Sequence, residues 1–139
     1  MAQKTINPYF EHTQPNPTET KYTSTKGDCV IRAFANATDK TWLEAFDLLT
    51  AEARATYDVP NGKSCYEGLF KKLGYKQSSF PAIKGKKRMT VERFCKEHPK
   101  GRYMISLSNH LCAVVDGKVL DTWYRGDKCV YMCYTITEE

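Results

Sequence analysis

Cys29, His110 and Asp121 have the residue types and the sequence context that nucleophilic catalysis requires. Cys29 directly precedes a stretch of helical apolar periodicity, so we expect its thiol at the first turn of a helix. Unpaired backbone N–H groups and the positive end of the helix dipole favour a thiolate there. Because the thiolate is the nucleophilic form, Cys29 is the candidate nucleophile and His110 is its candidate base.

A single β-hairpin is predicted to position the base and a carboxylate beside it. Asp116-Gly117 lies between two apolar runs and predicts a two-residue turn with positive φ. This turn pairs Cys112 with Asp121 and His110 with Trp123, and period-two alternation puts the four side chains on one face. Diagonal neighbours on that face lie about 7–8 Å apart, so Asp121 can hold the His110 ring. A purely structural Asp–His pair would have the same pattern.

The elements that position these residues follow from periodicity and capping signals. Asp28, the box Thr41–Glu44, the box Ser64–Glu67 and Thr90 each predict the start of a helix. Strands are expected at residues 102–107, 110–115, 118–124 and about 128–136. Helices followed by a meander predict an α+β fold, with N-terminal helices packed on a C-terminal antiparallel sheet.

Length and composition predict one domain. The chain has 139 residues and is 41% hydrophobic, which is enough for one sizeable core. Residues 1–24 are polar, contain three prolines and lack periodicity, so they are predicted to form an irregular arm before a single domain at 25–139. No run approaches the roughly 18 apolar residues of a membrane span, and the first residues lack the apolar block of a secretion signal. We therefore expect a cytoplasmic protein with reduced thiols.

The remaining cysteines carry a weaker alternative. Most of them lie in apolar patterns, where a reduced cysteine behaves as a small core residue. A zinc site would need His110 and Cys112 to meet Cys129 and Cys133. Cys129 and Cys133 are about 13 Å apart along a strand, too far to bind one ion, so neither a metal nor a cofactor is expected.

The charge distribution suggests a second alternative. Lys and Arg total 21 against 16 Asp and Glu, a net charge of +5. A basic stretch contains Lys84, Lys86, Lys87 and Arg88 and has aromatic residues near it, the composition of a weak nucleic-acid contact. Such a run is more often a solvated linker.

Two motifs resemble those of small papain-like cysteine peptidases. They are Gly-Asp-Cys-Val-Ile-Arg-Ala, which includes Cys29, and the segment from Asn109-His110 to Asp121-Thr-Trp. They are similar to the compact variants found in phage and bacterial proteins and in the peptidase domains of bacteriocin exporters. The resemblance implies a Cys29–His110–Asp121 triad that cleaves a peptide, isopeptide or related amide bond of a peptide or protein substrate. It also implies the host cytoplasm as the location if the protein is phage-encoded.

The resemblance also assigns an oxyanion hole and a substrate cleft. Papain-like enzymes place a Gln several residues before the nucleophile, and here Thr23 is the candidate for that position, together with the backbone N–H of Cys29. Asp28, Asn109 and Trp123 are the candidate cleft residues. Because the Gln is missing, the alternative is a catalytically weak papain-like binding module, such as a phage protein that captures a host partner or nucleic acid.

Overall fold

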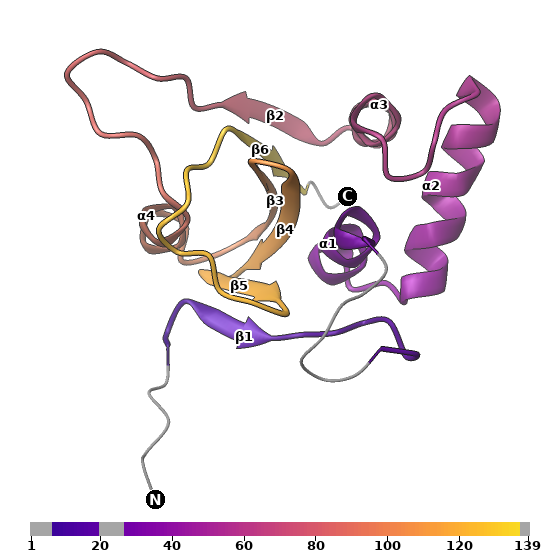
Figure 1. Cartoon of the computed structure of the whole chain (residues 1–139), viewed down its shortest axis with the longest axis horizontal. Helices are drawn as coiled ribbons and strands as arrows, with labels where there is room; N and C mark the ends of the chain where they lie inside the picture. The colour runs from indigo at the N-terminus through magenta and orange to yellow at the C-terminus, as the bar shows by residue number, and fades with distance from the viewer. Residues whose placement is uncertain (1–6, 20–26, 137–139) are drawn as a thin grey trace, which may run out of the picture.

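The computed structural model describes residues 7–19 and 27–136, which form four helices and six strands around one sheet. Helices α1, α2 and α3 cover one face of the sheet and α4 covers the other (Figure 1). The predicted α+β class is therefore confirmed. No helix among these residues is long and apolar enough to cross a bilayer. The helices are α1 (Cys29–Thr38), α2 (Trp42–Thr56), α3 (Lys63–Lys72) and α4 (Val91–Glu97). The strands are β1 (Phe10–His12), β2 (Lys76–Ser79), β3 (Arg102–Leu107), β4 (His110–Val115), β5 (Lys118–Asp121) and β6 (Met132–Thr135).

The sheet is mixed, so the prediction of an antiparallel sheet is wrong at one edge. Its order is β1-β5-β4-β3-β6-β2, and every neighbouring pair is antiparallel except β1 with β5. Strand β1 comes from residues 10–12, inside the segment predicted to be irregular. Three residues are too few to show an alternating pattern, and their pairing depends on the exposed edge that β5 offers.

Strand β2 forms the opposite edge and was also missed by periodicity. Its sequence is Lys-Gln-Ser-Ser, and it pairs antiparallel with β6. These polar residues are typical of an exposed edge strand and contain no apolar alternation. The segment after α3 was therefore predicted as a basic linker.

The core consists of two apolar layers separated by the sheet. Phe34, Leu49 and Phe70 pack on one face, while Phe94 from α4 packs on the other. Strand β4 contributes alternate residues to the two layers and is buried on both faces, which explains its near-continuous apolar sequence Leu-Cys-Ala-Val-Val. The start of α1 lies over this central strand and brings the candidate nucleophile to the start of β4.

The helix starts agree with three of the four capping predictions. Thr41 and Glu44 form the capping box of α2, and Thr90 accepts a hydrogen bond from the backbone of Arg93 at the start of α4. Asp28 occupies the N-cap position of α1 without making a cap hydrogen bond. The box at Ser64–Glu67 is wrong, because α3 begins at Lys63 and the Ser64 hydroxyl donates to Asp58 instead.

The hairpin between β4 and β5 has the predicted turn and register. Asp116 and Gly117 have φ values of 49° and 77°, and Val114 pairs with Val119. Strand β5 nevertheless ends at Asp121, so the predicted pairing of His110 with Trp123 is wrong. The Asp121 carboxylate accepts a hydrogen bond from the next backbone N–H, a local contact that competes with continuation of the strand.

Candidate active site

Cys29 is the first residue of α1, and its side chain is half-buried. The first four backbone N–H groups of a helix have no intrahelical acceptor, and the helix dipole is positive at this end. The sulfur therefore lies in an electropositive position, as the sequence predicts.

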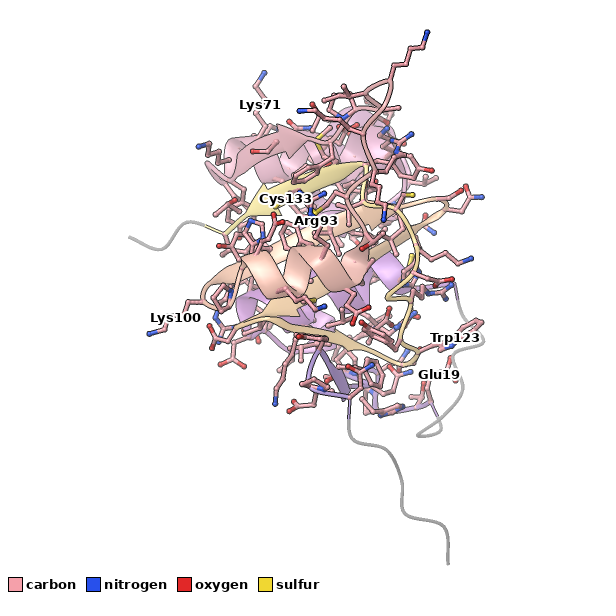
Figure 2. All side chains as sticks on the ribbon, turned by 90° about the vertical axis from the view of Figure 1, so that its left-hand side faces the viewer. Glu19, Lys71, Arg93, Lys100, Trp123 and Cys133 are labelled. Carbon is pink, nitrogen blue, oxygen red and sulfur yellow. The ribbon has the colours of Figure 1, made fainter. Side chains whose placement is uncertain are left out.

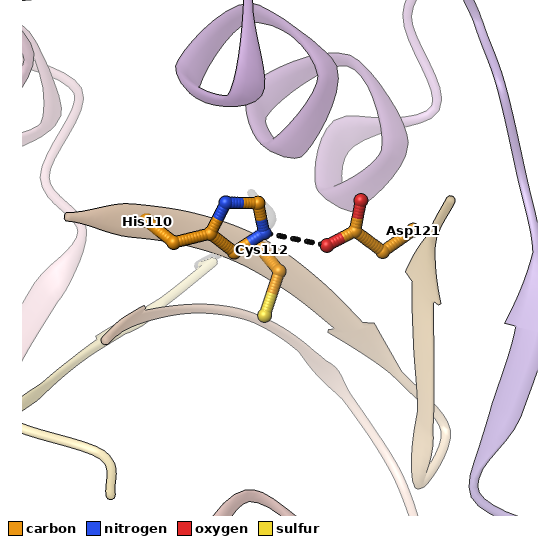
Figure 3. Close-up of side chains that lie close together, drawn as sticks. All are labelled: His110, Cys112 and Asp121. Atoms are coloured by element: carbon orange, nitrogen blue, oxygen red, sulfur yellow. Dashed lines mark hydrogen bonds and ion pairs between the residues drawn. The ribbon is translucent and has the colours of Figure 1, made fainter. Parts of the chain in front are cut away.

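His110 and Asp121 meet where β4 begins and β5 ends. His110 Nε2 lies 2.6 Å from Asp121 Oδ2, which is the predicted hydrogen bond (Figure 3). Both side chains are largely removed from water, with 9% and 4% of their surfaces exposed. The bond occupies Nε2, so Nδ1 is the ring nitrogen left for another partner. Asp121 thus fixes both the orientation and the tautomer of the ring.

The second partner of His110 is Cys29. Burial is the largest single influence on the Cys29 thiol and would raise its pKa, but hydrogen bonds from His110 and from the Leu111 backbone N–H, together with the charges of His110 and Arg32, lower that pKa below its ordinary value. For His110, burial would lower the pKa, but bonds to Asp121 and Cys29 raise it. Both shifts favour the same state, a thiolate beside an imidazolium.

Arg32 forms ion pairs with Asp121, beside His110, and with Asp28, at the start of α1. Its Nη1 lies 2.7 Å from Asp121 Oδ1, and its Nε lies 2.9 Å from Asp28 Oδ1. Burial would raise the pKa of Asp121, but the hydrogen bond and charge of His110, the Thr122 N–H and the charge of Arg32 lower it. Asp121 therefore stays ionised next to His110.

Asp28 anchors the other end of this network. The second oxygen of its carboxylate accepts hydrogen bonds from Trp42 Nε1 at 2.9 Å and from Asn16 Nδ2 at 3.3 Å. Asp28 is buried behind Cys29 and lines neither hollow that contains the thiol. It was predicted as a cleft residue, whereas the structure gives it a supporting place.

Sequence reasoning missed Arg32, Trp42 and Asn16 as parts of this network. A signal existed for Arg32, because it follows Asp28 by four residues and this spacing puts opposite charges on one face of a helix. Trp42 fits the apolar periodicity of α2, which hides the fact that its indole N–H needs a partner when buried. For Asn16, twelve residues before Asp28, no local signal exists.

Two hollows meet at the thiol. Four residues line both of them: Gly27, Cys29, Asn109 and His110. The first hollow extends over the start of α3 to Lys63, Tyr66 and Tyr131, and the second extends to Thr122, Trp123 and Arg125. Asn109 lines both hollows and Trp123 lines the second. The sulfur is therefore open on two sides.

Comparisons with protein-family models, with curated proteins and with solved structures found no match to this chain. Its own residues therefore carry the functional argument.

The predicted oxyanion donors are placed in part. The backbone N–H of Cys29 is at the first turn of α1, where helix geometry leaves it without an intrahelical acceptor. Thr23, the other candidate, lies outside the residues that the structure describes. The position of the Cys29 N–H is thus compatible with the predicted role, which stays a prediction.

The zinc alternative is not assembled among the described residues. His110 and Cys112 cluster with Asp121, with ligand atoms within 4.8 Å of one another, and not with Cys129 and Cys133. Figure 3 shows the Cys112 sulfur turned away from the His110–Asp121 bond. Arg32 already binds Asp121, and a cation at that position opposes the binding of a metal ion.

The basic stretch lies apart from the thiol, in the loop between β2 and α4. Lys84, Lys86 and Lys87 are exposed there, but Arg88 is half-buried, donates to the carbonyl of Phe80 and stacks on Tyr131. Phe80, an aromatic residue close to this stretch in the sequence, is half-buried and packs edge-on against Phe94 in the core. Its ring is therefore less available for stacking on a base.

Proposed function

We propose that the protein is a papain-like cysteine hydrolase that cleaves a peptide, isopeptide or related amide bond through Cys29, His110 and Asp121. The observation that carries the proposal is the continuous chain of contacts from Cys29 to His110 to Asp121, each with its pKa displaced in the direction that catalysis needs. Open hollows on both sides of the thiol support a peptide or protein as the substrate.

The proposed reaction has two steps, formation of a thioester and its hydrolysis, and in each of them His110 first accepts and then donates a proton. His110 takes the proton of Cys29, and the sulfur attacks the substrate carbonyl to form a tetrahedral oxyanion near the start of α1. When the oxyanion collapses, the C–N bond breaks, the His110 proton goes to the leaving amine, and a thioester remains on Cys29. His110 then deprotonates a water molecule, which attacks the thioester and releases a carboxylic acid. The proton returns to the sulfur.

Asp121 would act through His110 and not on the substrate. Its charge stabilises the imidazolium, and its hydrogen bond keeps Nδ1 directed at the sulfur. Acyl transfer to an amine in place of water would use the same residues, so the site favours a reaction class and leaves the acceptor open.

Alkylation by iodoacetamide tests the activated thiol without knowledge of the substrate. We expect Cys29 to be labelled first at neutral pH, well before Cys65 and Cys95, because burial raises the pKa of both these thiols. The labelled position is read by mass spectrometry. His110→Ala should slow labelling of Cys29 on the order of 100-fold at pH 6, where an unassisted thiol is almost fully protonated. Equal rates at the three cysteines, or a His110→Ala variant as reactive as the parent, would refute the proposal.

A further inference from the structure

We propose that the cleft selects peptide substrates with an acidic side chain close to the scissile bond, and that Arg125 binds this carboxylate. The inference rests on the proposed function and adds the class of substrate to it. It begins from the charges that line the two hollows beside Cys29. Apart from the Cys29–His110 pair, the charges among the described lining residues belong to Lys63 in the first hollow and to Arg32 and Arg125 in the second, and none of these residues is an Asp or a Glu.

Arg32 and Arg125 differ in what they already bind. Arg32 is buried between two carboxylates and has no charge to offer a substrate. Arg125 is half-buried, and within the described part of the chain no carboxylate forms an ion pair with it. Its Nε is shielded from solvent and has no hydrogen-bond acceptor there. A shielded donor without an acceptor is unfavourable, and no contact among the described residues compensates it.

Trp123 holds Arg125 in place from one side. The guanidinium lies 4.7 Å from the centre of the Trp123 ring, a cation–π arrangement. Trp123 is 66% exposed, and Figure 2 shows it at the periphery of the molecule. Stacking restricts the guanidinium plane, and Arg125 lines the second hollow, so its Nη groups are the donors proposed to bind a carboxylate, which arginine can do with two parallel hydrogen bonds.

The position of Arg125 places this recognition next to the reacting bond. Arg125 shares the second hollow with Cys29 and His110, so a substrate carbonyl at the sulfur puts neighbouring side chains into the same hollow. Arg125 also lines a third hollow with Asp127 and Lys128, where the two lining cations outnumber the single carboxylate. In both hollows that Arg125 lines, lysine and arginine side chains therefore outnumber carboxylates.

Peptide acyloxymethyl ketones test the selection. In this reaction the Cys29 thiolate forms a bond to the methylene carbon of the probe, the C–O bond breaks, and a carboxylate leaves. Three sets of probes carry Glu, Gln or Lys at one position, moved in turn through the three residues before the ketone. At one of these positions we expect the Glu probe to label Cys29 about tenfold faster than the Gln probe, which corresponds to about 1.4 kcal/mol.

Variants of Arg125 test whether this residue causes the preference for the Glu probe. Each Glu-to-Gln ratio is measured within one variant, so any change in thiol reactivity cancels. Arg125→Gln should bring the ratio to about one, and Arg125→Glu should favour the Lys probe. The control is Arg93→Gln, because Arg93 lies on α4 in an exposed pair with Glu97 and should retain the preference of the parent.

Two results would overturn the selection: equal rates for Glu and Gln probes at all three positions, or a Glu preference that survives Arg125→Gln. The proposed function is tested by a different measurement, because labelling by iodoacetamide does not depend on recognition of a peptide. A Cys29 that iodoacetamide labels no faster than Cys65 would refute the activated thiol, whatever the probes show.

Discussion

Cys29 and Cys112 both lie close to the His110–Asp121 pair but in opposite environments. The pKa of the Cys29 thiol is lowered, whereas burial and the nearby charge of Asp121 raise that of Cys112 well above its ordinary value. Cys112 belongs to the apolar layer under α4, where burial also raises the pKa of Cys95 to about 12 and of Cys133 to about 11. Proximity to His110 and Asp121 is therefore insufficient to lower the pKa of a thiol. Cys29 differs from Cys112 because its sulfur accepts hydrogen bonds from His110 and the Leu111 N–H and lies at the start of a helix.

The largest effect is expected when each of these two cysteines is replaced by alanine in turn. Cys29→Ala should lower hydrolysis of a quenched fluorescent peptide library on the order of 10⁵-fold, because no other group can form the thioester. Cys112→Ala is the matched control, since Cys112 takes no part in proton transfer. It should retain most of the turnover, measured as initial rate per folded protein. A comparable loss in both variants would mean that the layer under α4 belongs to the catalytic machinery.

Asp121→Asn tests the contact between Asp121 and His110 and should lower turnover on the order of 10³-fold. An amide cannot stabilise the imidazolium, and its N–H₂ group favours the wrong tautomer of His110. The pH profile separates this role from a structural one. The parent should retain an imidazolium at higher pH than the variant, because the bond to Asp121 raises the pKa of His110. Identical profiles for the parent and a folded Asp121→Asn variant would contradict a positioning role.

The regions that periodicity predicts well are those whose signals are local. The Asp116-Gly117 turn determines the pairing of β4 with β5, and the bounds of β3 and β4 agree with the predicted strands. Strands β1 and β2 were missed because three or four residues at an edge take their structure from a neighbouring strand. Their formation depends on tertiary contacts that no short window contains.

The same distinction between local signals and tertiary contacts holds for the residues of the site. Cys29, His110 and Asp121 were predictable because each stands at an end of a helix or strand with a recognisable signal. Asn16 and Arg125 were missed, since their contacts join segments far apart in the chain or depend on where a loop folds back. The contacts of the proposed triad thus follow from local sequence, whereas those of Asn16 and Arg125 follow from packing.

Arg32→Met should destabilise the fold by about 3–5 kcal/mol, because it leaves two buried carboxylates without their cation. The matched control is Arg93→Met, which breaks an exposed pair on α4. Exposed pairs typically contribute about 0.2–1 kcal/mol. The free energy of unfolding from urea titration at pH 7 measures both. Equal losses would show that the network under Cys29 is no more important for stability than a surface ion pair.

Lowering the pH should also destabilise the fold through Asp28 and Asp121, but by less than Arg32→Met does. In the folded state, burial would raise the pKa of Asp28, but Arg32, Trp42 and Asn16 lower it, and the pKa of Asp121 is lowered as well. When the pH falls to the ordinary carboxyl pKa near 4, the unfolded chain binds protons before the folded one does. The stability contributed by both groups is full above that pH and is lost as the pH falls through the folded values.

The two carboxyls together should lower the free energy of unfolding by about 1 kcal/mol between pH 7 and pH 4, because half of each group is protonated in the unfolded chain at the lower pH. The variant Asp28→Asn removes one of these groups and keeps the bond between Asp121 and His110, so the contribution of His110 to the pH dependence is retained. It should lose about 0.4 kcal/mol less than the parent over that interval. Urea titrations at the two pH values give the difference. The same acid dependence in the parent and in Asp28→Asn would assign it to carboxyls elsewhere, and the contrast between the two sides of the sheet would then rest on the thiols alone.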